Sequence, residues 1–193
     1  MNKNAPIAVP AVLGSLVGYL EGLTARAPLD ALAAYLRDSR VTVGDVRDFL
    51  HFEAGNYCRN LIVAGPWYDL LVLCWRSGQR SPIHDHARSS CAFKVLTGVC
   101  SETVYGLSPC GQVVPLRTDN RCAGSIVATQ DADTHQVSNL QPTGMDLVTL
   151  HIYTPPLRSM HLFSILGGET RNSAALAHAD PAHLLVSADG DGI

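Results

Sequence analysis

Charged residues are scarce in this sequence, and it has no surplus of positive charge. Only 16% of the 193 residues are charged, with 14 Lys and Arg against 17 Asp and Glu, so the formal net charge is −3. Nucleic acids and anionic membranes attract proteins through clustered Lys and Arg side chains. The composition therefore predicts neither nucleic acid nor a membrane as a partner.

Long apolar runs are also absent. No run approaches the roughly 20 residues that a membrane-spanning helix needs. The apolar N-terminal stretch is interrupted by Pro6, Pro10 and Gly14. Such interruptions are untypical of the apolar region of a signal peptide. We expect a cytoplasmic protein.

Paired cysteines are missing as well. The six cysteines form no Cys-x-x-Cys pair, and a chain of this length does not need disulfides to stabilise its core. Because 47% of the residues are hydrophobic, we expect residues 1–193 to form a single domain, as a monomer or weak oligomer. Five cysteines are interpreted as small buried hydrophobes; Cys91 stands apart because it lies in a histidine-containing motif.

Residues 11–52 have the apolar spacing of helices. Leu13, Leu16 and Leu20 recur at i, i+3 and i+7, which indicates one buried helical face. Pro28 opens a second helical stretch, and Thr42 is placed to cap a third. His51, at the end of this third stretch, is interpreted as a structural or surface residue rather than a metal ligand.

Short strands follow from about residue 56. They are rich in branched and aromatic residues, and many are separated by Gly, Pro, Asn or Asp, which is typical of an antiparallel sandwich or barrel. The predicted strands are 56–65, 67–75, 91–98, 101–106, 112–116, 125–130, 146–154 and 160–166. After residue 168 the pattern fades, and we expect a loosely packed tail over residues 169–193.

Two histidines separated by one residue stand at the centre of the sequence. On a β-strand, residues i and i+2 point to the same face, so His84 and His86 can both face one metal ion. Gly78 lies six residues before His84, and Gly98 lies twelve residues after His86. This spacing resembles the first sequence motif of the cupin β-barrels, G-x5-H-x-H-x3,4-E-x6-G. The position that usually carries a glutamate ligand holds Cys91.

A third histidine completes the set. His135 follows Gly124 by eleven residues and precedes Asn139 by four. This resembles the second cupin motif, with Gln130 and Ala132 in place of its proline and second glycine. The resemblance implies facing hairpins on which the three histidines converge. It also implies a mainly β fold, a jelly-roll-like cupin barrel over residues 56–167 with the helices of residues 11–52 packed outside.

The missing glutamate changes the charge of the predicted site. Imidazole suits Fe, Zn, Cu and Ni, so the ligand type alone leaves the metal open. Three neutral histidines leave the full double positive charge of a divalent ion in place. Such a centre favours an anionic ligand such as a thiolate, and three ligands on one side leave further positions for a bidentate substrate and O2.

Several segments together resemble the cysteine dioxygenases, mononuclear iron enzymes that oxidise the thiol of L-cysteine to a sulfinic acid. The resemblance covers roughly residues 50–165, and the segments that carry it are 57–61, 74–75, 83–91, 94–98 and 150–156. It implies that His84, His86 and His135 bind one Fe(II) per chain. It also implies that Arg59 binds the substrate carboxylate, for which a guanidinium is well shaped, and that Tyr57 assists it.

The same resemblance assigns a polar row to residues 146–154. Tyr153 matches the active-site tyrosine of the family, His151 the histidine behind it, and Thr149 stands where the family has a serine. Because these residues alternate along one strand, their side chains share a face and can form a hydrogen-bonded row. Cys91 matches the cysteine that, in some members, joins the tyrosine through a thioether bond.

The implied function is a cysteine dioxygenase that acts on L-cysteine and O2. A close alternative is a dioxygenase for 3-mercaptopropionate, although such relatives tend to carry glutamine at the position of Arg59. A different cupin enzyme, such as a Zn or Mn isomerase, is disfavoured by the missing glutamate and by the row that ends at Tyr153. A non-catalytic cupin that serves as a metal-dependent sensor or binding module is the alternative from another class.

Overall fold

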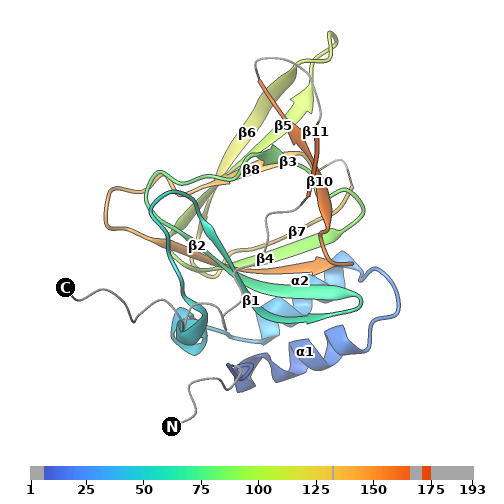
Figure 1. Ribbon diagram of the computed structural model, residues 1–193, viewed down its shortest axis with the longest axis vertical. Coiled ribbons are helices and arrows are strands. Elements are labelled where there is room, and N and C mark those ends of the chain that lie inside the picture. The colour runs from blue at the N-terminus through green and yellow to red at the C-terminus, as the bar shows by residue number, and fades with distance from the viewer. Residues whose placement is uncertain (1–6, 132, 166–170, 175–193) are drawn as a thin grey trace, which may run out of the picture.

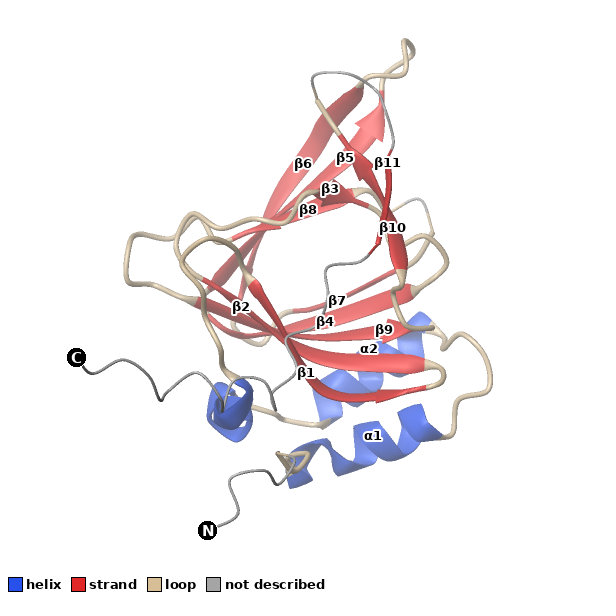
Figure 2. Cartoon of the chain, viewed as in Figure 1, coloured by secondary structure: helices blue, strands red, loops and turns tan. Residues whose placement is uncertain are grey.

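Two antiparallel β-sheets face each other in the computed structural model of the chain, which describes residues 7–131, 133–165 and 171–174 (Figures 1 and 2). The first sheet has the strand order β1-β2-β9-β4-β7, with bounds Cys58–Gly65, Tyr68–Trp75, Leu147–Thr154, Ser90–Thr97 and Ile126–Thr129. The second sheet has the order β11-β10-β3-β8-β5-β6, with bounds Arg171–Ala174, Ser159–Phe163, Ile83–His84, His135–Ser138, Val99–Leu107 and Val113–Cys122. Every strand pair in both sheets is antiparallel.

The first sheet is covered on both faces. All eight residues of β2 and all eight of β9 are buried; β2 accordingly reads as a nearly continuous apolar run, whereas β9 alternates apolar residues with Thr149, His151 and Tyr153. Alternate residues serve different cores: Leu70 and Val72 pack towards the helices, whereas Leu71 and Leu73 pack between the two sheets. This two-residue period places the odd-numbered side chains of β2 and β9 inside the sandwich.

Helices cover the outer face of the first sheet (Figure 2). They are η1 (Ala11–Leu13), α1 (Gly14–Glu21), α2 (Leu29–Asp38) and η2 (Val43–Phe49). Their buried leucines, among them Leu16, Leu32 and Leu36, join the core formed by the outward side chains of β2 and β9. A buried lysine adds a polar tie, since Lys94 Nζ of β4 donates to the Leu36 carbonyl at 3.2 Å.

The chain passes from the first sheet to the second at Gly98, between β4 and β5. Gly98 has a φ of +82°, a conformation that residues with a Cβ rarely adopt. A Cβ there would lie 2.6 Å from the Asp146 carbonyl oxygen, too close for any other residue. The last glycine of the first histidine motif is therefore explained by the tight turn that takes the chain across the sandwich.

The mainly β fold predicted from the sequence is confirmed, and helices do lie outside the sheets. Thr42 caps η2 in a capping box with Asp45, although η2 is a 3-10 helix rather than an α-helix. Strands β3 and β8 were not predicted, because two and four residues are too few for a visible periodicity.

The predicted tail over residues 169–193 falls mostly outside the described residues. Within it, β11 pairs with β10, an element that the fading apolar pattern did not indicate. The division of the chain into helical part, barrel and tail stays a prediction. Among the described residues, no helix is both long and apolar enough to span a bilayer.

The packing of α2 on the first sheet makes a stability prediction. Leu36→Ala removes a fully buried side chain from the core between helix and sheet, so the free energy of unfolding should fall by about 2–5 kcal/mol. Urea denaturation followed by circular dichroism measures this change. Arg37→Ala, at the exposed next position, should change the value by less than about 0.5 kcal/mol. Equal losses in both variants would contradict the packing account.

Candidate metal centre

Three histidines of the second sheet and its adjoining segment meet between the sheets. His84 of β3 is the register partner of His135 in β8, and His86 follows two residues after His84. Their ring centroids are 5.2, 4.9 and 4.9 Å apart. All three side chains are buried, and one nitrogen of each lies within 4.8 Å of the others. This triangle has the size and composition of a metal site.

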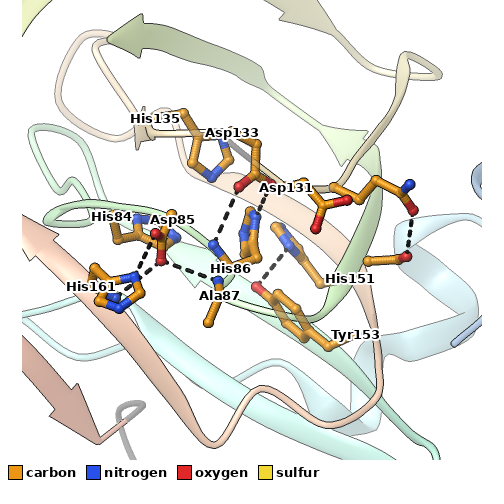
Figure 3. A network of polar contacts seen from close by, with 12 residues as sticks. His84, Asp85, His86, Ala87, Asp131, Asp133, His135, His151, Tyr153 and His161 are labelled. Carbon is orange, nitrogen blue, oxygen red and sulfur yellow. Dashed lines mark hydrogen bonds and ion pairs between the residues drawn. The ribbon is translucent and has the colours of Figure 1, made fainter. Parts of the chain in front are cut away.

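Each histidine has its Nδ1 atom occupied by an acceptor. His84 Nδ1 lies 3.0 Å from the Pro82 carbonyl oxygen, His135 Nδ1 lies 3.0 Å from Glu102 Oε1, and His86 Nδ1 contacts Asp133 Oδ2 (Figure 3). An acceptor at Nδ1 holds the proton there, so each Nε2 keeps a lone pair for a metal. The three imidazoles are therefore set in the tautomer that a divalent ion requires.

His86 is positioned by a turn rather than by a strand. The spacing of the two histidines would suit a single strand, but β3 ends at His84. Asp85 fixes the segment beyond it: Oδ1 accepts from the backbone N–H groups of Ala87 at 3.1 Å and of His161 at 3.0 Å, and Oδ2 lies 2.7 Å from His161 Nδ1 (Figure 3). Ala87 has a φ of +49°. The turn brings His86 to the same side as His84.

Burial favours the neutral form of the ligands. Desolvation lowers the pKa of His84 far below its usual value, and the neighbouring histidines lower it further. Desolvation also lowers the pKa of His86, although its bond to Asp133 opposes this. Burial raises the pKa of Glu102, but the contacts with His135 and Arg121 outweigh it, so the net pKa is lowered. Neutral imidazoles backed by carboxylates suit a cation.

The second carboxylate also stays ionised. Burial raises the pKa of Asp133, but its hydrogen bond to His86 outweighs this and leaves the net pKa lowered. A cavity of about 490 Å³ reaches these two carboxylates from the side where β5, β6 and β7 lie, and is lined among others by Glu102, Arg121, Asp133 and His135. The carboxylates can therefore be solvated from behind the triangle while the ligand nitrogens face the interior.

The first sheet contributes a row of polar side chains. Trp75 Nε1 donates to Thr149 Oγ1 at 3.1 Å, Thr149 Oγ1 lies 2.9 Å from His151 Nε2, and His151 Nδ1 lies 3.2 Å from the Tyr153 hydroxyl (Figure 3). As predicted, the side chains at 149, 151 and 153 share a face. Desolvation lowers the pKa of His151 far below its usual value, so the ring carries one proton, whose place sets the direction of the hydrogen bond to Tyr153.

The row reaches the three-histidine triangle through aromatic contact. The Tyr153 ring lies 5.7 Å from the His86 ring, centroid to centroid. Desolvation raises the pKa of the Tyr153 hydroxyl, which is therefore a neutral donor at ordinary pH. Phe93 stacks on His151 with a centroid distance of 4.9 Å. The phenol is thus a fixed, protonated group beside the triangle.

Arg59 lies on the inner face of β1 with an incompletely satisfied guanidinium. The side chain is 5% exposed, and its Nε and Nη2 atoms have no hydrogen-bond partner. Burial lowers the pKa of the guanidinium, but the neighbouring Tyr153 and Tyr57 outweigh this and leave it raised; its Cζ lies 5.1 Å from the centre of the Tyr153 ring. Tyr57 itself stacks on Trp75 at 4.1 Å. Buried donors without partners indicate a place for an anionic ligand.

Cys91 is opposite Tyr153. The two residues are register partners on β4 and β9. Burial raises the pKa of the Cys91 thiol well above its usual value, so the sulfur is protonated. The residue at the glutamate position of the motif therefore belongs to the tyrosine row rather than to the three-histidine triangle.

Sequence reasoning missed four residues that hold the site together: Trp75, Asp85, Glu102 and Asp133. A signal existed for Asp133, since a carboxylate two residues before His135 shares its face on an extended strand. No local signal marked Glu102, which comes from β5. Asn139, the last residue of the second motif, lies away from the histidines and donates to the carbonyls of Trp75 and Met145.

Two facing antiparallel sheets with three converging imidazoles are the arrangement of a cupin with a candidate metal site. The sequence profile of cysteine dioxygenase type I matches residues 6–165. Because that match covers most of the chain, the chain belongs to the cysteine dioxygenase type I family. Arg59, the three histidines and the tyrosine row all lie inside the matched region.

Curated relatives of this family are similar over about two thirds of the chain. The chain is 35% identical to "Cysteine dioxygenase type 1" of Danio rerio over 129 residues, which are 62% of this chain and 61% of that one. It is 30% identical to the Homo sapiens protein of the same name over 138 residues, 68% of this chain and 67% of that one. A Klebsiella pneumoniae structure described as having a double-stranded β-helix domain matches with a TM-score of 0.49 at 15% identity, covering 72% and 93%.

The contact of Asp133 with His86 makes a prediction about metal affinity. Asp133→Ala removes the acceptor that holds the His86 proton on Nδ1, so metal should bind about 10–100-fold more weakly. Competition with a chromogenic chelator measures the affinity. The matched control is Asp131→Ala, two residues before Asp133 in the sequence. It removes a surface ion pair with Arg26 and should leave the metal affinity unchanged. Equal affinity in both variants would contradict the positioning role.

Proposed function

We propose that this protein is a cysteine dioxygenase, which uses one Fe(II) and O2 to oxidise the thiol of L-cysteine to a sulfinic acid. The observation that carries the proposal is the buried guanidinium of Arg59, with two nitrogens free of partners, beside the three-histidine site. Family membership supports the same chemistry. Small thiols and O2 are the partners that the proposal requires.

The residues fit the proposed iron. His84, His86 and His135 would hold it through Nε2, because each Nδ1 is already engaged. Three neutral donors leave the ion's double positive charge uncompensated, which favours an anionic ligand such as a thiolate. When bound, Fe(II) would supply the centre at which the substrate thiolate and O2 meet and exchange electrons.

Arg59 would bind and orient the substrate. Its two unpartnered nitrogens can donate to the two oxygens of a carboxylate, a geometry that fixes direction as well as affinity. Tyr57 supports Arg59 from the side and is itself held by its stack on Trp75. Holding the carboxylate at one end places the thiol of an amino acid towards the three-histidine site.

Tyr153 would position the reacting groups by hydrogen bonding. Its hydroxyl is a neutral donor, and when the His151 proton lies on Nδ1, that nitrogen donates to the phenol oxygen and leaves the phenol proton free. Thr149 sustains this arrangement by donating to His151 Nε2, while Trp75 donates to Thr149. The row can thus hold one proton facing the pocket in a defined place.

Cys91 and Tyr153 would form a thioether crosslink. Their register pairing on neighbouring strands places the sulfur beside the tyrosine side chain. Formation joins sulfur to a ring carbon and breaks one S–H and one C–H bond. The two protons and two electrons pass to O2, the oxidant that the proposed activity already uses. The bond would fix the phenol in its position.

The function is tested by O2 uptake of the Fe(II)-loaded protein. L-cysteine and 3-mercaptopropionate are compared at equal concentration, and the products are identified by mass spectrometry. The expected result is faster O2 uptake with L-cysteine and formation of its sulfinic acid. Of the two substrates, only L-cysteine combines a thiol and a carboxylate with an α-amine. Preference for 3-mercaptopropionate would overturn the substrate, and no uptake with either thiol would favour the sensor or binding module.

The role of Arg59 is tested in the same assay. Arg59→Ala should raise KM for L-cysteine by about 10–100-fold, the loss expected for a hydrogen-bonded charge pair, with a smaller change in kcat. Arg47→Ala removes an arginine whose side chain is 79% exposed and should leave KM unchanged. An unchanged KM in Arg59→Ala would contradict the carboxylate role.

The crosslink is tested by peptide mass analysis. After turnover with iron, L-cysteine and O2, a joined Cys91–Tyr153 peptide should be two hydrogens lighter than the sum of its separate parts. Cys91→Ser provides the control, since serine is close to cysteine in size and shape but has no sulfur to form the thioether. Detection of separate, unmodified peptides alone after many turnovers would rule the crosslink out.

A further inference from the structure

We propose that the loop before β1 forms a second metal site, in which His51, Glu53 and Cys58 bind one divalent cation of the Zn²⁺ class. One ligand atom of each residue lies within 4.8 Å of the other two. This site shares no residue with the three-histidine triangle and is independent of the proposed dioxygenase activity. The sequence interpretation of His51 was a structural or surface residue; the proposal gives it a ligand role as well.

The donor atoms are close to the geometry that a tetrahedral ion needs. His51 Nε2 lies 3.4 Å from Glu53 Oε1, and two such ligands on one zinc ion are separated by about 3.4 Å. The gap between these two atoms and the Cys58 sulfur must close by roughly 1 Å at most for all three to bind one ion. The side chains of His51 and Glu53 can move to close it, since they are 32% and 63% exposed.

The loop that carries the ligands is held in place from two directions. Gln79 Nε2, from the segment between β2 and β3, donates to the carbonyl oxygens of Glu53 at 2.8 Å and Ala54 at 3.3 Å. Asn60 Nδ2, from β1, donates to the His51 carbonyl at 3.2 Å. The backbone is therefore ordered before any ion arrives, which lowers the entropy lost on binding.

The donor set selects the class of cation. One imidazole nitrogen, one carboxylate oxygen and one sulfur suit zinc and similar borderline ions, whereas calcium and magnesium prefer oxygen alone. Cys58 would bind as thiolate and release its proton to solvent. The carboxylate and thiolate then balance the double charge of the ion, and water can fill the fourth position on the exposed side.

The site lies on the opposite face of β1 from the proposed substrate site. Cys58 belongs to the core between the first sheet and the helices, whereas the Arg59 guanidinium contacts Tyr57 and Tyr153 inside the sandwich. Successive side chains of a strand point to opposite faces. A bound cation would join the end of the helical segment to β1, the edge strand of the first sheet. It would lie outside the space between the sheets that holds Arg59 and the three histidines.

Cobalt(II) titration of the iron-loaded protein tests the proposal. A thiolate ligand gives Co²⁺ a sulfur-to-metal charge-transfer band in the near ultraviolet, whereas three histidines give none. The expected result is one equivalent of Co²⁺ bound per chain with this band, with iron retained by elemental analysis. Addition of Zn²⁺ should remove the band by competition.

Variants separate this site from other thiols. Cys58→Ser should abolish the band, and the exposed substitutions His51→Gln and Glu53→Gln should weaken Co²⁺ binding by about tenfold or more, at least the loss seen when a supporting partner of a ligand is removed. Cys110→Ser, at an exposed cysteine elsewhere, should keep both. Circular dichroism checks that each variant folds.

Three results would overturn the second site. The first is titration without a charge-transfer band. The second is a band that persists in Cys58→Ser but disappears in Cys91→Ser, which would mean that cobalt had entered the three-histidine site. The third is unchanged Co²⁺ affinity in both His51→Gln and Glu53→Gln, two variants that leave the buried Cys58 in place. The contact between His51 and Glu53 would then be an ion pair beside an ordinary thiol.

Discussion

The structure depends on the satisfaction of buried polar groups between two sheets. Imidazoles, a guanidinium and a phenol lie in an interior where each unpaired donor or acceptor is unfavourable by about 1–3 kcal/mol. The second sheet meets this constraint with an acceptor for each histidine Nδ1, and the first meets it with a continuous row from Trp75 to Tyr153. The unpartnered nitrogens of Arg59 are therefore a meaningful exception.

The two sheets divide the work of the site. The second sheet and its adjoining turn bring the three histidines and the carboxylates behind them, whereas the first sheet brings Arg59, Cys91 and the tyrosine row. The helices do not reach the interior, but they pack against the outward side chains of β2 and β9 and bury the outer face of the first sheet. A two-layer fold thus lets the three histidines of one sheet face the Arg59 guanidinium of the other across the interior.

Long, strongly patterned elements could be predicted, and short ones could not. Strand β2 was visible because most of its eight buried residues are apolar, and β9 because branched and aromatic residues recur along it. Strands β3 and β8 carry His84 and His135 but are too short to show a period. The segment that follows β3 is held by hydrogen bonds to the Asp85 side chain. Such a polar turn leaves no pattern of apolar residues in the sequence from which the strand could be predicted.

The sequence by itself determined the residue types and spacings of the histidine motifs, the alternation of Thr149, His151 and Tyr153 on one face, and the family resemblance. These follow from local rules, because a strand alternates its faces and a tight turn needs glycine. Only the tertiary structure decided that Asp133 and Glu102 orient two of the histidines, that Trp75 ends the tyrosine row, and that His51 meets Cys58. Those contacts join residues from separate elements, and nothing in the spacing along the chain specifies which distant side chains the fold will bring together.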